Sequence, residues 1–227
     1  MNSNETGILG RRPWPTAFLG AVASVATVIA LIGITVALFF NPLWIGFGQE
    51  RAGVPAITGY TPEEVRGVTG SILADVIFGP PAFAAAVNGR PVLDAAERSH
   101  MVDVHNVLRV FGGIAGLAIV SLVTIVGTGR WSRWVWRAIA HGSSALVLVG
   151  VVVGVASLFF FDAAFLLFHR VFFPQGNFSF DPRTQRLTQL FPDQFWTETS
   201  IGIAIVGLVI AITVTLVARR LSARLPD

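Results

Sequence analysis

The stretch AFLGAVASVATVIALIGITVALFF, residues 17–40, decides the class of fold because it contains no charged side chain. A helix over these residues, rising about 1.5 Å per residue, is longer than the ~30 Å hydrocarbon core of a membrane. Three further apolar runs of membrane-spanning length follow, over about 107–126, 145–168 and 201–217. We therefore predict an all-α membrane protein with four transmembrane helices, forming a single integral membrane domain over residues 1–227.

The composition also indicates a membrane protein. Of the 227 residues, 53% are hydrophobic and 13% are charged, whereas soluble domains carry about 25% charged residues. All 16 basic residues are arginines, and the high isoelectric point reflects the high pKa of arginine, so it does not indicate nucleic-acid binding. The chain has no cysteine, which excludes disulfides, thiol nucleophiles and thiolate metal sites. The first apolar run is far longer than the core of a signal peptide, so we interpret it as a retained span.

The placement of arginine predicts the orientation, since Lys and Arg near the ends of spans stay on the cytoplasmic side. Arginines precede the first run, fill the short connection between the second and third, and follow the last: Arg11, Arg12, Arg130, Arg133, Arg137, Arg219, Arg220 and Arg224. Most acidic residues lie in the other two connections, about 41–104 and 169–200. We therefore predict that both termini are cytoplasmic and that these two outer loops form an extracytoplasmic cap.

The first outer loop contains two helix-start signals. Thr61-Pro62-Glu63-Glu64 predicts an N-cap and a capping box for a helix that runs to about Phe78 and ends at Gly79-Pro80-Pro81. Asp94 and Glu97 form a second box, and no helix breaker separates it from the second span. That helix is expected to enter the membrane without interruption. The second outer loop is rich in Phe, Trp and Pro, which predicts packing onto the bundle rather than exposure to water.

Topology separates the four histidines. His100, His105 and His169 are predicted on the outer side, and His141 at the cytoplasmic end of the third span. We interpret His141 as interfacial and His105 as structural, while spacing alone leaves a structural and a functional role open for His100 and His169.

Charged residues lie near these histidines along the chain. Glu97, His100 and Asp103 share one stripe of a helix, because residues three and four apart are neighbours. Asp162 precedes His169 by two turns in the third predicted span, and a carboxylate within a membrane needs a partner. Arg109, one turn inside the second span, is its expected partner in a buried, structural ion pair.

A metal site is a weaker interpretation of the same residues. Glu97-x-x-His100 has the spacing of helical carboxylate-bridged metal centres. Those centres require a second such pair and further carboxylates, and this chain has one pair. We therefore predict no metal.

Specific residues of the outer segments resemble a known family. Glu97-x-x-His100-x-x-Asp103-Val104, followed by FHRVFFPQGNFSF (168–180) and LTQLFPDQFW (187–196), resembles the bacterial lipoprotein intramolecular transacylase (Lit) family of four-span membrane proteins. The order of spans and loops resembles that of the family over most of the chain, and specific residues match in these segments. The chain departs from the family pattern in having Phe178 where tryptophan is usual and in lacking lysine.

The resemblance implies an enzyme that acts on diacylated lipoproteins, among membrane lipids, at the outer face of the bacterial cytoplasmic membrane. It moves the sn-2 acyl chain of the lipid-modified cysteine onto the α-amine of that cysteine and leaves an N-acyl lyso-lipoprotein. No cofactor is implied. The implied catalytic residues are His100 and His169, and the supporting residues that we expect beside them are Glu97, Asp103, Arg109 and Asp162.

This chemistry is reasonable for two imidazoles. An α-amine with a pKa of about 7.7–8.0 must lose a proton before it attacks an ester, and a histidine with a pKa of about 6.5 can accept it. The second histidine would donate to the oxyanion, with Glu97 or Asp103 orienting His100. The sequence leaves open which histidine is the base and whether an acyl-histidine forms. The alternative function is a non-enzymatic membrane scaffold with structural histidines.

Overall fold

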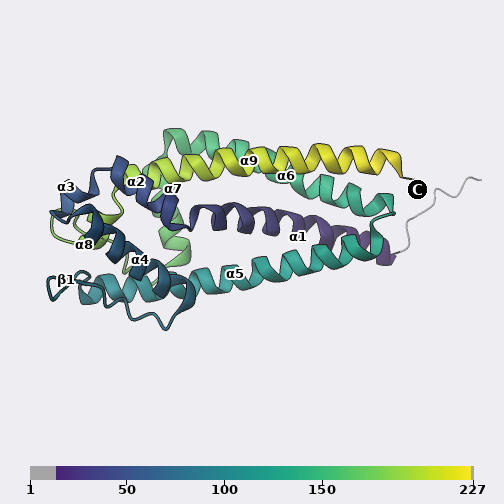
Figure 1. Ribbon diagram of the computed structural model, residues 1–227. Coiled ribbons are helices and arrows are strands. Elements are labelled where there is room, and N and C mark those ends of the chain that lie inside the picture. The colour runs from purple at the N-terminus through teal and green to yellow at the C-terminus, as the bar shows by residue number, and fades with distance from the viewer. Residues whose placement is uncertain (1–13, 226–227) are drawn as a thin grey trace, which may run out of the picture.

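The computed structural model of the chain describes residues 14–225. Within them, four helices are long and apolar enough to cross a membrane: α1 (Trp14–Phe39), α5 (Ala95–Gly129), α6 (Arg133–Phe159) and α9 (Asp193–Arg224). They run in alternating directions along one elongated bundle (Figure 1). The prediction of an all-α fold with four spans is confirmed. The predicted inner arginines Arg11 and Arg12 lie outside the described residues.

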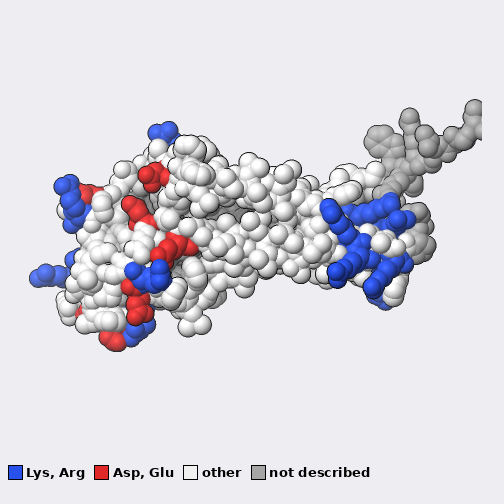
Figure 2. Space-filling view, turned by 90° about the horizontal axis from the view of Figure 1, so that it is seen from above, with Lys and Arg blue, Asp and Glu red and all other residues white. Residues whose placement is uncertain are grey.

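Shorter elements lie at one end of the bundle, which we call the cap end (Figure 1). They are α2 (Pro42–Arg51), α3 (Val54–Thr58), α4 (Pro62–Phe78), β1 (Ala86–Val87), β2 (Arg90–Pro91), α7 (Phe161–Phe172) and α8 (Arg186–Leu190). The two strands pair antiparallel as a small hairpin. We call the opposite end the arginine end. Figure 2 shows basic side chains without acidic ones gathered there, whereas acidic and basic side chains appear together at the cap end.

Both predicted helix-start signals are confirmed. Thr61 caps α4 and forms a capping box with Glu64, and α4 ends at Gly79. Asp94 caps α5 and forms a box with Glu97. Because α5 continues from this cap to Gly129, the helix that starts in the cap is also a membrane-spanning helix, as predicted.

Helix α1 occupies the centre of the bundle, where it contacts α5, α6 and α9. Its buried side chains include Ala23, Ala26 and Ala30, and small residues of this kind let membrane helices approach closely. The approach to α6 is so close that a Cβ at Gly142 would collide with the backbone carbonyl of Ser24. The cap has its own hydrophobic core, formed largely by α3, α4, α8 and the start of α5.

The third span differs from the prediction of 145–168. The helix begins earlier, at Arg133, and ends at Phe159. Phe160 then adopts a non-helical backbone, with φ −134° and ψ 40°, and the separate helix α7 turns across the bundle (Figure 1). The apolar run continues through this break without proline or glycine, so hydropathy could not reveal it. As a consequence, Asp162 and His169 both lie on α7 rather than on the third span.

Candidate active site

His100 lies in the second turn of α5, at the cap end. The Asp94–Glu97 capping box fixes the start of this helix, and the ring of His100 is buried, with 6% of its surface exposed. Phe173 and Phe180 contact the ring edge-on, with centroids 4.8 and 5.5 Å from its own. His100 is therefore held in an apolar environment by residues of the second outer loop.

His169 approaches His100 from α7. The two imidazole centroids are 6.1 Å apart and the rings are inclined by 26°. Nδ1 of His169 lies 2.8 Å from the carbonyl oxygen of Phe165, one turn earlier on the same helix. A carbonyl only accepts hydrogen bonds, so Nδ1 carries the proton and Nε2 of the neutral ring carries the lone pair. The predicted pair of histidines is thus brought together by two helices that are distant in sequence.

Aromatic side chains surround the pair. Ring centroids of Phe165, Phe178 and Phe173 lie 4.2, 5.2 and 5.6 Å from that of His169. Phe178 is the residue that stands in place of the tryptophan usual in the family. A site of this kind excludes water and strengthens electrostatic interactions within it. We call His100, His169 and these phenylalanines, with Phe168 and Phe180, the aromatic site.

Asp103 lies one turn after His100 and anchors the second outer loop. Its Oδ2 accepts hydrogen bonds from the side-chain amides of Asn177 (2.6 Å) and Gln175 (2.8 Å). Because the Asn177 nitrogen donates to Asp103, the amide oxygen of Asn177 is not used in that contact. Within residues 14–225, Nδ1 of His100 and Oδ1 of Asn177 are both buried and neither has a hydrogen-bond partner. Asn177 is therefore a candidate orienting group for His100, which spacing along one helix could not reveal.

Glu97 does not orient His100. Its carboxylate is 1% exposed and accepts two backbone hydrogen bonds, from Asp94 N (2.6 Å) and from Leu187 N on α8 (2.7 Å). The residue instead ties the start of α5 to the second outer loop. Asp94 contributes to the same junction, because the Glu97 N–H and the Gln185 side chain hold the pKa of the Asp94 carboxyl below its usual range.

The expected ion pair between Arg109 and Asp162 is not formed. Both side chains are exposed on the bundle, and no ion pair joins them among the residues that the structure describes. The prediction assumed that Asp162 continues the third span, whereas it lies in the first turn of α7. The prediction that His105 is structural is supported, since its buried ring hydrogen-bonds the carbonyls of Asp75 and Val76 at the end of α4.

No group of three or more His, Asp or Glu side chains that could hold a metal ion occurs among residues 14–225. The carboxylate oxygens of Glu97 are used by backbone donors, so the Glu97-x-x-His100 spacing does not form the half-site considered above. The donor set at the aromatic site consists of two imidazoles.

Comparison with known proteins shows the family of the chain. The family model described as lipoprotein intramolecular transacylase Lit matches residues 18–196. The chain belongs to the Lit family. It is therefore an integral membrane acyltransferase of the intramolecular transacylase class, as the resemblance implied.

Solved structures agree on the Lit fold. A structure of the membrane integral lipoprotein intramolecular transacylase Lit from Bacillus cereus has a TM-score of 0.78 and 15% identity, over 92% of this chain and 97% of that chain. Variants with one histidine replaced by arginine or by alanine have TM-scores of 0.72 and 0.70, each with 17% identity and 92% coverage of this chain, over 93% and 94% of theirs. No curated protein matches the sequence.

Proposed function

We propose that this Lit-family chain transfers the sn-2 acyl group of a diacylglyceryl-cysteine lipoprotein to the α-amine of the same cysteine, and that His100 and His169 perform the transfer. The observation that carries the proposal is the pair of imidazoles, 6.1 Å apart between centroids, inside the aromatic site. The substrate class comes from the family. The residues were predicted from the motif resemblance, and the geometry of this chain supports them.

His169 is the proposed base. Its Nδ1–H is committed to the carbonyl of Phe165, so Nε2 is the atom that accepts a proton. It removes a proton from the α-amine, and the nitrogen attacks the carbonyl carbon of the sn-2 ester. When the tetrahedral intermediate collapses, the carbon–oxygen bond breaks and the imidazolium returns the proton to the departing glyceryl oxygen. The products are an amide and a free sn-2 hydroxyl, with no other reactant consumed.

His100 is the proposed oxyanion donor. Asp103 holds Asn177 through its amide nitrogen, and the buried amide oxygen of Asn177 is the proposed orienting acceptor for an N–H of the His100 ring. The His100 ring donates an N–H to the oxyanion, and the apolar surroundings strengthen that interaction. Asp103 and Asn177 are positioning residues in this proposal.

The phenylalanines bring the two reacting ends of the substrate together. Donor ester and acceptor amine belong to one molecule, so the site must hold it in a folded-back conformation, which gains rate through proximity. The apolar rings accommodate acyl chains and keep water away from the ester, which disfavours hydrolysis.

The proposed location is the outer face of the bacterial cytoplasmic membrane, with both termini inside. Its support is the distribution of charge: the arginine end shows basic side chains without acids, and the acids lie with further arginines at the cap end (Figure 2). The aromatic site at the cap end would then face the compartment in which mature lipoproteins display their lipid-modified cysteine.

The test is expression in a bacterium that makes only diacylated lipoproteins, followed by mass spectrometry of N-terminal lipopeptides. The active protein leaves the mass unchanged and moves one acyl chain to nitrogen, which fragmentation reveals. His100→Ala and His169→Ala each lower the rate by about 10²–10⁴-fold, whereas the exposed cap variant Arg66→Ala keeps it. Unchanged lipid connectivity with correctly inserted wild-type protein would favour a scaffold instead.

A further inference from the structure

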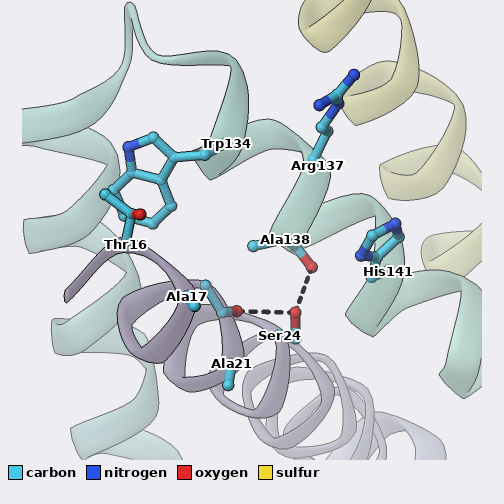
Figure 3. A pocket seen from close by; sticks show the side chains of 9 residues that line it. Thr16, Ala17, Ala21, Ser24, Trp134, Arg137, Ala138 and His141 are labelled. Carbon is cyan, nitrogen blue, oxygen red and sulfur yellow. Dashed lines mark hydrogen bonds between the residues drawn. The ribbon is translucent and has the colours of Figure 1, made fainter. Parts of the chain in front are cut away.

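An apolar groove lies in the elbow between α6 and α7. Helix α6 ends at Phe159, and α7 leaves it after Phe160 and turns across the bundle (Figure 1). The groove has a volume of about 290 Å³ and is lined by residues of both helices. It is separate from the cavity between α1 and α6 at the arginine end, where the Ser24 hydroxyl donates to the carbonyl of Ala138 (Figure 3).

Small side chains leave the groove open. Ala156 and Ser157 line it from α6, and Ala163 and Ala164 line it from α7. Ser157 is the only lining residue with a polar side chain. Burying the polar backbone of a peptide there would leave hydrogen-bonding groups without partners, which is costly, whereas a hydrocarbon chain has no such groups. The lining therefore fits a hydrocarbon chain.

The groove lies behind the helix that carries His169. Ala163, Ala164 and Leu167 recur at helical spacing and share one face of α7. His169 comes two residues after Leu167 and five after Ala164, which puts it on the other side of the helix. There it contacts the rings of His100 and Phe178. A chain in the groove is thus separated from the reacting ester by the width of α7.

A guanidinium lies at one end of the groove. Arg170 follows Leu167 by one helical turn, so the two side chains lie on the same side of α7. Arg170 is exposed, and it makes no hydrogen bond or ion pair with another residue in the part of the chain that the structure describes. Leu167 and Val171, each 63% exposed, are its apolar neighbours. A basic residue beside exposed apolar ones is typical of helices at the boundary between headgroups and acyl chains.

The groove and Arg170 match the two parts of a phospholipid. The planar guanidinium fits phosphate oxygens, and the apolar elbow fits a chain that descends from the same glycerol. We propose that the groove binds one acyl chain of a phospholipid whose phosphate oxygens accept hydrogen bonds from Arg170. The bound lipid packs behind α7 and supports the helix that presents His169. In the proposed orientation it belongs to the outer leaflet.

The experiment is native mass spectrometry of the purified full-length protein with phosphatidylglycerol, diacylglycerol or glycerol phosphate added in turn. Diacylglycerol has the chains without the phosphate, and glycerol phosphate has the phosphate without the chains. We expect phosphatidylglycerol to bind at least about tenfold more tightly than either, because one charge-assisted contact or a few buried methylene groups contribute that factor.

Two variants separate the two parts of the site. Arg170→Gln removes the charge, and Ala163→Leu fills the groove while keeping every arginine. Each should weaken phosphatidylglycerol binding about tenfold or more. The matched controls are Arg90→Gln, which removes an exposed charge of the cap hairpin, and Ala223→Leu, at an exposed alanine of α9 at the arginine end. Both controls should leave binding unchanged.

Three results would overturn the proposal. Equal binding of diacylglycerol, or equal weakening by Arg90→Gln, would show that Arg170 does not recognise the phosphate. Glycerol phosphate that binds as tightly as the lipid, or unchanged binding by Ala163→Leu, would show that the groove holds no chain. Displacement of phosphatidylglycerol by an equimolar synthetic diacylated lipopeptide would assign the groove to the substrate. Binding is measured without turnover, so this proposal and the proposed transacylation can fail separately.

Discussion

Glu97→Gln should loosen the junction between α5 and the second outer loop without a direct effect on the chemistry. The carboxylate accepts backbone hydrogen bonds from Asp94 and Leu187 while 1% exposed. Glutamine has the same size but only one acceptor oxygen, so one of the two backbone N–H groups faces an NH₂ group and remains unpaired.

The magnitude follows from these two bonds. A hydrogen bond to a charged group contributes about 1.5–3 kcal/mol and a neutral one about 0.5–1.5 kcal/mol. Glu97→Gln loses one hydrogen bond to a charged acceptor and converts the other to a hydrogen bond with a neutral acceptor, which together cost roughly 2–4 kcal/mol. Glu64→Gln is the matched control, because Glu64 occupies the same position of the capping box of α4 with one backbone donor and greater exposure. Its cost should be about 1 kcal/mol or less.

The assay is amide hydrogen exchange of the purified protein, followed by mass spectrometry of peptides that contain Leu187. Each 1.4 kcal/mol lost from local stability speeds exchange about tenfold where this junction opens locally. The activity of Glu97→Gln should fall only in proportion to this loosening. If exchange at Leu187 is no faster than in Glu64→Gln, the carboxylate does not hold α8. If activity is abolished while exchange is unchanged, Glu97 acts in the reaction itself.

Three further results are expected. In Gly142→Ala the new methyl group collides with a backbone carbonyl of α1, and the free energy of unfolding should fall by about 1–3 kcal/mol. In Gly127→Ala the methyl group enters open space, and the free energy of unfolding should stay equal or rise. Asn177→Ala removes the orienting group of the oxyanion donor and should slow transacylation up to about tenfold in initial-rate assays, with inserted protein unchanged. The pKa of the Asp94 carboxyl is lower in the folded protein than its usual 3.8. Its ionised form therefore stabilises the fold above pH 3.8, and this stabilisation is lost as the pH falls through the folded pKa. The difference in melting temperature between wild type and Asp94→Asn should therefore shrink in acid.

Local signals predicted the helices that begin in the cap. The capping boxes at Thr61 and Asp94 are complete within four residues, so their hydrogen bonds depend little on the rest of the chain. The break at Phe160 has no such signal. A helix may end within an apolar run when tertiary packing stabilises another direction, and the sequence around Phe160 contains neither glycine nor proline.

The candidate site was predicted in part. His100 and His169 were named from motif resemblance, and the structure places their rings together. The partners expected from spacing were wrong for Glu97, which binds backbone donors, and for the pair of Arg109 and Asp162. Spacing along one helix identifies shared faces, but it does not identify which distant loop packs on them.

The sequence by itself determined that the chain is a four-helix membrane protein with charge separated between its two ends. Transfer of a charged side chain into hydrocarbon is costly whatever its neighbours are, so apolar runs and arginine placement carry that information residue by residue. Only the tertiary structure decided that α7 leaves the third span and brings His169 beside His100, and that Asn177 of the second outer loop hydrogen-bonds Asp103, one turn after His100. Those contacts join segments far apart along the chain, and they exist because the second outer loop folds back to bury its aromatic side chains against α5.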